Sequence, residues 1–260
     1  MPEGDTIHRA ADTLRRAIGG QRVRGFSSTL PALAHVELTG ATVEAVEARG
    51  KHLLVRFDDG RTLHTHMRMT GSWHIYRPGE RWRVGAHRAR AVIETEPWVA
   101  VCFDAPLCEL VRAGVTPALV AQLGPDLLDP GADLDEAVRR MRARADLPLG
   151  VAVMRQRLVS GIGNVYKSET LFIRRADPFA PVAVHDDAAL RAILEEAQRL
   201  LRLNLTRSAR RTRHRLRGER VWVYGRSGKP CLRCGATVRM RRQGDEARST
   251  YYCPRCQSSR

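Results

Sequence analysis

Four of the six cysteines form two close pairs near the end of the chain, and their spacing restricts that region more than any other feature does. The pairs are Cys231-x2-Cys234 and Cys253-x2-Cys256, with eighteen residues between them. Each Cys-x2-Cys turn can present two sulfurs to one Zn²⁺ ion, and structural zinc sites are closed tetrahedra of such ligands. The spacing therefore predicts one structural zinc ion, held by a small module whose spacer forms a hairpin.

A redox dithiol or two disulfides are the alternatives to zinc. A redox role would need only one pair, and a cytosolic setting disfavours structural disulfides. Four thiolates leave no open position for water, so we expect the metal to support the fold and expect no catalytic cofactor. The remaining Cys102 and Cys108 lie in an apolar region without His or Cys at ligand spacing, and we expect them to be buried thiols.

The chain is strongly basic, with a formal net charge of +16 and a sequence pI near 10.8. Nearly all of the cations are arginines, a bias that genome base composition can produce. However, sixteen basic residues lie from Arg207 onward, where Glu219, Asp245 and Glu246 are the acids. This concentration favours a nucleic-acid-binding surface over a membrane-binding one, and a solvated basic tail is the remaining alternative.

The sequence contains no apolar run near the roughly 20 residues of a membrane span, and its start lacks the apolar stretch of a secretory signal. We therefore expect a soluble protein in the cytoplasm that is not associated with a membrane.

A helix, a β-rich region and a group of helices follow one another along the chain. Apolar residues recur at helical spacing over residues 4–18, where Asp5 or Thr6 can cap the start. Residues 36–103 contain short stretches rich in Val, Thr and aromatics, which indicate strands, and Asp58-Asp59-Gly60 is typical of a hairpin turn. Helical patterns then occupy residues 135–145, 149–159, 164–175 and 186–205.

The turn Ser160-Gly161-Ile162-Gly163-Asn164 separates two of these helices. Its glycines allow left-handed dihedral angles, and Asn164 stands where the next helix begins. Backbone N–H groups and the helix dipole at such a start favour an anion. An ordinary helical hairpin with a capping Asn is an equal alternative.

Five motifs occur in one order: the start Met1-Pro2-Glu3-Gly4, a helix that reads IHRAAD over residues 7–12, Arg49-Gly50-Lys51, the glycine turn, and the paired cysteines of a terminal zinc finger. In this the chain resembles the formamidopyrimidine-DNA glycosylase and endonuclease VIII family from Pro2 to Gln257. The resemblance implies an α+β, multidomain fold, with an N-terminal β-sandwich preceded by a helix, a helix-two-turn-helix domain and a zinc-finger hairpin. We place these at residues 1–121, 135–220 and 221–260, with a linker at 122–134.

The resemblance also implies a bifunctional DNA glycosylase and AP lyase of base excision repair, acting on damaged DNA. Removal of Met1 would expose the amine of Pro2, which attacks the sugar C1′ and forms a Schiff base that leads to β- or β,δ-elimination. Glu3 matches the proton donor to the sugar ring, and Lys51 matches a lysine that contacts the lesion's phosphate. A surface carboxylate and a solvated strand-end lysine are the respective alternatives.

The remaining matches concern DNA contacts. Asn164 matches a turn residue that binds phosphate, and Lys167 follows it on the same helix. Arg248 matches the finger arginine beside the flipped nucleotide, and we expect Arg241 and Arg242 to contact phosphate from the same hairpin. Met69 aligns with a residue that fills the space left by that nucleotide, with a core methionine as the alternative, and we expect Arg68 beside it to contact the orphaned base.

Two departures bear on the substrate: Thr6 stands where many relatives carry Glu, and Gln122 where a basic residue is common. The endonuclease VIII-like start, and little room between Asn204 and Cys231 for a purine-clasping loop, favour oxidised pyrimidines. The alternative function is a nonenzymatic zinc-finger protein that binds DNA damage. A zinc hydrolase is disfavoured, because four thiolates saturate the ion.

Overall fold

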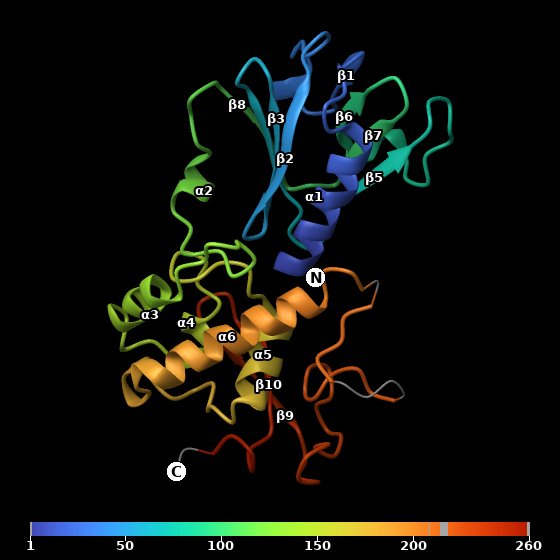
Figure 1. Cartoon of the computed structure of the whole chain (residues 1–260). Helices are drawn as coiled ribbons and strands as arrows, with labels where there is room; N and C mark the ends of the chain where they lie inside the picture. The colour runs from blue at the N-terminus through green and yellow to red at the C-terminus, as the bar shows by residue number, and fades with distance from the viewer. Residues whose placement is uncertain (1, 208, 214–217, 259–260) are drawn as a thin grey trace. The chain divides into compact units, whose positions relative to one another are not determined.

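The computed structural model describes residues 2–207, 209–213 and 218–258. The chain divides into two compact units, Met1–Gln122 and Leu123–Arg260, and Figure 1 shows the elements of each. The finer division, with a linker at 122–134 and a zinc finger from residue 221, stays a prediction. None of the helices in the described ranges has the length and apolar character needed to cross a bilayer.

The first unit contains two four-stranded antiparallel sheets. One sheet has the order β1 (Gly25–Ser27), β6 (Ala89–Glu94), β7 (Val99–Phe103), β5 (Ser72–Tyr76). The other has the order β2 (Val43–Arg49), β3 (His52–Phe57), β4 (Thr62–His66), β8 (Leu107–Val111). The short elements of this unit are η1 (Pro31–Leu33), η2 (Ala86–Arg88) and α2 (Ala118–Ala121). The strands β1 and β8 were not predicted, whereas the turn at Gly60, with φ +82°, was.

Helix α1 (Gly4–Ile18) covers the edge of this core. Its buried apolar side chains share one face, as the predicted spacing requires: Ile7, Ala11, Leu14 and Ile18. The predicted cap at Asp5 or Thr6 is wrong, because the helix already begins at Gly4 and its N-cap is Glu3 in an extended conformation. The Glu3 carbonyl accepts the first helical bonds, from Thr6 N at 2.9 Å and Ile7 N at 3.1 Å.

The second unit is helical and ends in a two-stranded hairpin. Its elements are α3 (Leu134–Arg142), α4 (Leu149–Ala152), α5 (Asn164–Ile173), η3 (Val182–Val184), α6 (Asp187–Leu203), β9 (Arg239–Gln243) and β10 (Arg248–Tyr252). The helix predicted over 149–159 is a single turn. Beyond it the Gln156 carbonyl accepts from Gly124 N and the Arg157 carbonyl accepts from Arg140, so tertiary contacts replace further helical bonds.

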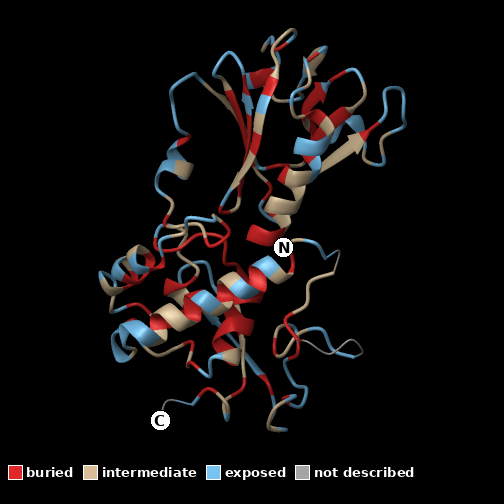
Figure 2. Ribbon diagram, in the orientation of Figure 1, coloured by how far each residue is buried: buried red, intermediate tan, exposed pale blue. Residues whose placement is uncertain are grey.

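Helix α5 lies at the centre of this unit and is buried along nearly its whole length, as the red ribbon in Figure 2 shows. Its Glu169 is fully buried, and the carboxylate accepts hydrogen bonds from the backbone N–H groups of Trp222, Val223 and Tyr224 at 2.7–2.8 Å. The Thr212 hydroxyl donates to the same carboxylate. The buried Glu169 carboxylate thus holds Thr212 and residues 222–224 against α5. These partners lie on both sides of the arginine-rich segment, residues 213–220.

We predict that Glu169→Gln lowers the free energy of unfolding by about 3 kcal/mol, because an amide N–H₂ would face backbone donors in a buried site. Urea unfolding measures the change. The control is Glu195→Gln on the exposed side of α6, which should shift stability by less than about 0.5 kcal/mol. Equal stability of the two variants would contradict the role given to Glu169.

Candidate functional site

The start of the chain is positioned by the way α1 lies along β2 (Figure 1). Gly20 N donates to Val43 O at 2.8 Å and Arg15 Nη2 donates to Val46 O at 2.7 Å, so helix and strand run in opposite directions. From Arg15 back to Glu3 the helix rises about 18 Å, and from Val46 forward to Lys51 the strand advances about 17 Å. Glu3 and Lys51 are therefore brought to the same end of this unit.

Glu3 is fully buried, and its neighbour Pro2 is partly buried. The surface-carboxylate alternative for Glu3 is thus wrong. Lys51 is partly exposed in the turn between β2 and β3. This turn needs Gly50, whose φ of +58° is unfavourable for side-chain-bearing residues.

The loop after β4 leaves the sheet at the same end. Leu53 pairs with Thr65, so the end of β4 lies beside the start of β3 and its preceding turn. Met69 in this loop is 65% exposed, which makes the core-methionine alternative wrong. Arg68 has a φ of +44°, and a side chain at Gly71 would lie 2.8 Å from the Met67 backbone. The backbone therefore forms a tight turn that presents Met69 outward.

Three histidines beneath these loops were missed by the sequence analysis. His52 Nδ1 lies 2.8 Å from His64 Nε2, and His64 Nδ1 lies 2.8 Å from Glu109 Oε1. The His66 ring meets the His52 ring edge-on, with centroids 4.5 Å apart. The spacing His64-x-His66 placed two of them on one face of a strand, but only the strand register brings His52 and Glu109 to them.

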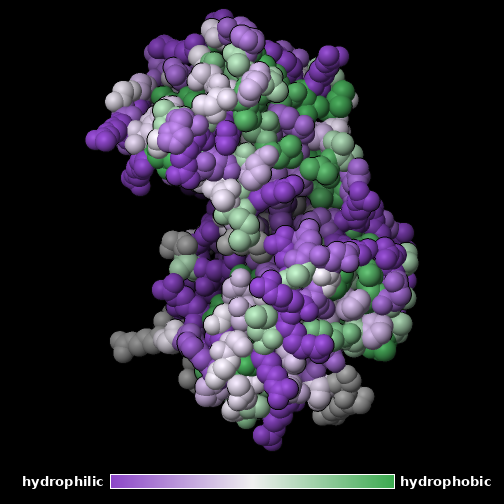
Figure 3. All heavy atoms as spheres, turned by 180° about the vertical axis from the view of Figure 1, so that it is seen from behind, coloured by the Kyte–Doolittle hydropathy of each residue, from purple (hydrophilic) through white to green (hydrophobic). Residues whose placement is uncertain are grey.

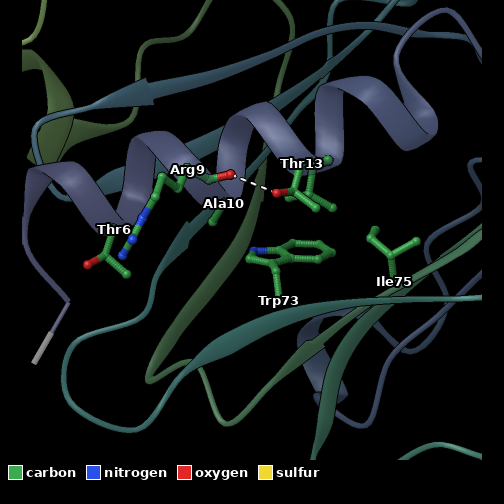
Figure 4. A pocket seen from close by; sticks show the side chains of 7 residues that line it. Thr6, Arg9, Ala10, Thr13, Trp73 and Ile75 are labelled. Atoms are coloured by element: carbon green, nitrogen blue, oxygen red, sulfur yellow. Dashed lines mark hydrogen bonds between the residues drawn. The ribbon is translucent and has the colours of Figure 1, made fainter. Parts of the chain in front are cut away.

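A groove of about 440 Å³ lies beside α1, between the helix and β5 (Figure 4). The indole of Trp73 forms one wall, while Thr6, Arg9 and Thr13 project from the helix. The Thr13 hydroxyl donates to the Arg9 carbonyl at 2.9 Å. The volume of this groove lies in the usual range for small-ligand sites. The departure at Thr6 therefore changes the lining of this groove, one helical turn beyond Glu3.

In the second unit the predicted turn precedes α5 directly. Gly161 has a φ of +101°, and Asn164 is the first helical residue, behind an N-cap at Gly163. The Asn164 Nδ2 donates to Ser249 Oγ at 3.0 Å, which ties the turn to the hairpin. Asn164, itself only 6% exposed, thus joins the turn to the surface of the hairpin in this unit.

Lys167 does not lie on that surface. Its side chain is 1% exposed, and Nζ donates to Thr250 Oγ1 at 2.8 Å and to Ser249 O at 3.1 Å. This placement does not favour the predicted phosphate contact, because the ammonium is already enclosed by protein acceptors. Instead the Lys167 ammonium joins α5 to the strand β10.

The sulfurs of Cys231, Cys234, Cys253 and Cys256 all lie within 4.8 Å of one another. A tetrahedron with Zn–S bonds of ~2.3 Å has its sulfurs about 3.8 Å apart, and the closest approaches are 3.5 Å for Cys234–Cys253 and 4.0 Å for Cys231–Cys256. The residues therefore fit one tetrahedral zinc ion. Cys102 is buried as predicted, and Cys108 is partly buried against the same core.

The hairpin between the cysteine pairs carries the predicted arginines. Arg241 and Arg242 are exposed on β9, opposite Thr250 and Ser249 of β10. Arg248 begins β10 and pairs with Glu246 at 2.6 Å. Hydrophilic side chains cover most of the face shown in Figure 3, with apolar ones in scattered patches. Positive groups and a rigid hairpin together suit contact with phosphates.

The histidine cluster predicts a pH dependence of stability. Burial lowers the pKa of His52 to about 3, helped by the nearby His66, His64 and Lys51. Burial also lowers the pKa of His66 to about 4, helped by Arg68, Lys51 and His64. As the pH falls through the ordinary value of 6.5, the unfolded chain binds protons before the folded chain does, so stability falls.

We expect the melting temperature to decrease from pH 7 to pH 5, and to decrease less in His52→Gln, which removes one of these sites. Thermal melts across this range test it. The exposed His35 supplies the control, because His35→Gln should keep the wild-type slope. Parallel slopes for His52→Gln and wild type would refute this origin of the dependence.

Three family models together match most of the chain. They are described as the formamidopyrimidine-DNA glycosylase N-terminal domain, over residues 1–106, the corresponding H2TH domain, over 123–215, and the zinc finger found in FPG and IleRS, over 228–258. The zinc finger and the predicted α+β architecture are thereby confirmed.

Curated and solved relatives extend over nearly the full chain. A "Probable endonuclease 8 2" of Streptomyces coelicolor is 44% identical over 99% of this chain and 94% of its own length. The "DNA-(apurinic or apyrimidinic site) lyase Nei2" of Mycolicibacterium smegmatis is 39% identical over the whole of both chains. The MutM (Fpg) crystal structure from Thermus thermophilus matches with a TM-score of 0.79, 29% identity and complete coverage of both chains. The chain therefore belongs to the formamidopyrimidine-DNA glycosylase and endonuclease VIII family.

Proposed function

We propose that this protein is a bifunctional DNA glycosylase and AP lyase of base excision repair, with Pro2 as its nucleophile. The observation that carries the proposal is the common position of Pro2, the buried Glu3 and Lys51 at one end of the first unit. The family's zinc finger and the names of the relatives support the same activity.

The chemistry begins at the amine of Pro2 once Met1 has been removed. An α-amine has a pKa of about 8, so roughly a tenth is neutral at pH 7 and able to attack. A bond forms from the Pro2 nitrogen to C1′, the bond from C1′ to the damaged base breaks, and the departing base keeps the electron pair and takes up the proton that the amine loses. Glu3 then protonates the ring oxygen, the C1′–O4′ bond opens, and the secondary amine becomes a positively charged iminium ion.

The iminium ion makes the C2′ hydrogen acidic. Loss of that proton breaks the C3′–O bond and releases the 3′ phosphate, which is β-elimination, and release of the 5′ phosphate can follow. Lys51 stabilises the phosphate beside the reacting sugar. From the hairpin, Arg248 binds the phosphate that flanks the flipped nucleotide. In the structure without DNA, the Arg248 guanidinium pairs with Glu246.

Bringing C1′ to Pro2 requires the nucleotide to leave the helix, which costs a few kcal/mol of stacking and pairing. The exposed Met69 fills the vacated space and Arg68 contacts the orphaned base. On the other unit, Asn164, Arg241 and Arg242 bind phosphates. The four cysteines hold a structural Zn²⁺ ion, which keeps the hairpin rigid and takes no part in the reaction.

Oxidised pyrimidines are the proposed preferred lesions. The endonuclease VIII-like start and the short connection between Asn204 and Cys231 support this preference, as do relatives named endonuclease 8. We place the protein in the cytoplasm, acting as a monomer on nucleoid DNA. The buried Glu3 disfavours a nonenzymatic damage-binding protein, because binding alone does not require an enclosed acid beside the terminal amine.

The nucleophile can be tested by borohydride trapping on duplex DNA with one abasic site. Wild-type protein lacking Met1, as checked by mass spectrometry, should form a covalent adduct, and Pro2→Gly should reduce its amount by more than tenfold. Lys51→Ala should still form the adduct, because Lys51 is not the attacking group. An undiminished adduct with Pro2→Gly would rule out Pro2, and binding without any adduct would favour the nonenzymatic alternative.

The hairpin contacts can be tested by the salt dependence of binding to the same duplex. Arg242→Ala should weaken binding and lower the slope of log K against log salt by about 1, the loss of one phosphate contact. The control is Arg199→Ala on α6, where Arg199 pairs with Glu196, and its slope should equal that of wild type. An unchanged slope for Arg242→Ala would remove that residue from the DNA-binding surface.

A further inference from the structure

A hydrogen-bonded chain crosses three strands beneath the loops that carry Lys51 and Met69. His52 begins β3, His64 lies on β4, and Glu109 is the direct partner of His64 on β8. His66 lies two residues beyond His64 on the same face of β4, with its ring against that of His52. We call His52, His64, His66 and Glu109 the imidazole brace.

The partners determine where the protons lie. The Glu109 carboxylate can only accept, so His64 donates to it from Nδ1. When the His64 ring carries this single proton, its Nε2 is the acceptor and His52 donates from Nδ1. In that arrangement each hydrogen bond of the chain has one donor and one acceptor.

The brace reaches the exposed loop through His66. The Arg68 backbone N–H donates to His66 Nδ1 at 3.2 Å, so that nitrogen accepts and the ring proton lies on Nε2. Arg68 has the left-handed φ of +44°, a conformation that costs free energy unless neighbouring contacts hold it. The next residue is Met69, so this hydrogen bond fixes the direction from which the Met69 side chain leaves the turn.

The brace reaches Lys51 through the chain itself, because His52 is the next residue and is 6% exposed. Lys51 and Arg68 both lie close enough to raise the energy of a protonated ring. Neutral imidazoles can make hydrogen bonds below two cations without adding a third positive charge. A Lys or Arg in the same place would repel both cations, and an apolar side chain would leave the Arg68 N–H without this acceptor.

We infer that the imidazole brace positions Lys51 and the Arg68–Met69 turn together, so that the void-filling loop and the phosphate-binding lysine move as one body when DNA is bound. The inference rests on the proposed function, which assigns those two roles. The members of the brace are positioning residues, and the chemistry stays with Pro2 and Glu3. Loss of the brace should therefore affect duplex substrates most, because only a duplex leaves an orphaned base and a space for Met69 to fill.

The test compares rates of borohydride trapping on duplex and on single-stranded DNA with one abasic site. His66→Leu removes the acceptor for Arg68 N, and it should slow trapping on duplex about tenfold or more and on single strands less than about threefold. His66→Asn should restore the duplex rate to within about threefold, because Asn Oδ1 can take the place of Nδ1 as acceptor. His74→Leu is the matched control, since His74 is a partly buried histidine of β5 outside the brace. This variant should change the trapping rates on duplex and on single strands by the same factor.

A second pair of variants tests the other end of the brace in case His66→Leu does not fold. Glu109→Gln keeps an oxygen that accepts from His64, whereas Glu109→Leu does not. Glu109 is 46% exposed at its side chain, so both changes should leave the fold intact. The duplex-specific loss should appear in Glu109→Leu and be smaller in Glu109→Gln. In addition, ¹⁵N spectra should show His52 neutral at pH 6 with its proton on Nδ1, and His66 neutral with its proton on Nε2.

Wild-type rates for the His66→Leu and Glu109→Leu variants, or equal losses on duplex and single strands, would overturn the brace. Protonated rings at pH 6 would overturn it as well. These outcomes differ from a failure of the proposed function, in which wild-type protein itself would form no adduct on either DNA.

Discussion

The antiparallel contact of α1 with β2 is the constraint on which the first unit's site depends. The bonds from Gly20 N to Val43 O and from Arg15 to Val46 O lie near the far end of the helix. Yet the rigidity of a continuous helix transmits that position over several turns to Pro2 and Glu3. A flexible arm could carry the same two residues, but it would not hold a terminal amine and a buried acid beside Lys51.

In the second unit, buried polar contacts on α5 fix the positions of the segments that carry the site residues. Glu169 holds the chain on both sides of the arginine-rich segment, and Lys167 holds β10. Arg233, next to the second zinc ligand, donates to the Phe172 carbonyl at 3.1 Å and so fixes the zinc module to the end of α5. The exposed arginines of the hairpin therefore project from a support that is tied at several points.

Local sequence patterns predicted the helices and strands whose formation depends mainly on their own residues. The helix at 4–18 has the predicted bounds, because its own apolar periodicity sets them, and β3 (His52–Phe57) lies within the region predicted to form strands. The short strands β1 and β8 were missed, since their backbone pairing depends on β6 and β4 and not on their own residues. The helix predicted over 149–159 failed for the same reason, as Gly124 and Arg140 take its carbonyls.

The site residues divide in the same way, into those that a local sequence pattern indicates and those that only the fold brings together. The zinc ligands were predictable because Cys-x2-Cys is a local geometry, and Pro2, Glu3 and Lys51 were found through the family resemblance. Burial was not predictable: Glu3 and Lys167 are enclosed, while Met69 is exposed. The histidine chain was hidden as well, because His52, His64 and Glu109 are distant in sequence and meet only through the register of three strands.

The central claim is that the terminal imino group of Pro2 bonds to C1′ of the damaged nucleotide. The most direct measurement is to digest the borohydride-reduced protein–DNA adduct and locate the deoxyribose by tandem mass spectrometry. The reduced sugar should be found on the amine of Pro2, in a peptide that begins at that residue. The chain has only three lysines, Lys51, Lys167 and Lys229, and a sugar attached to any of them would contradict the central claim.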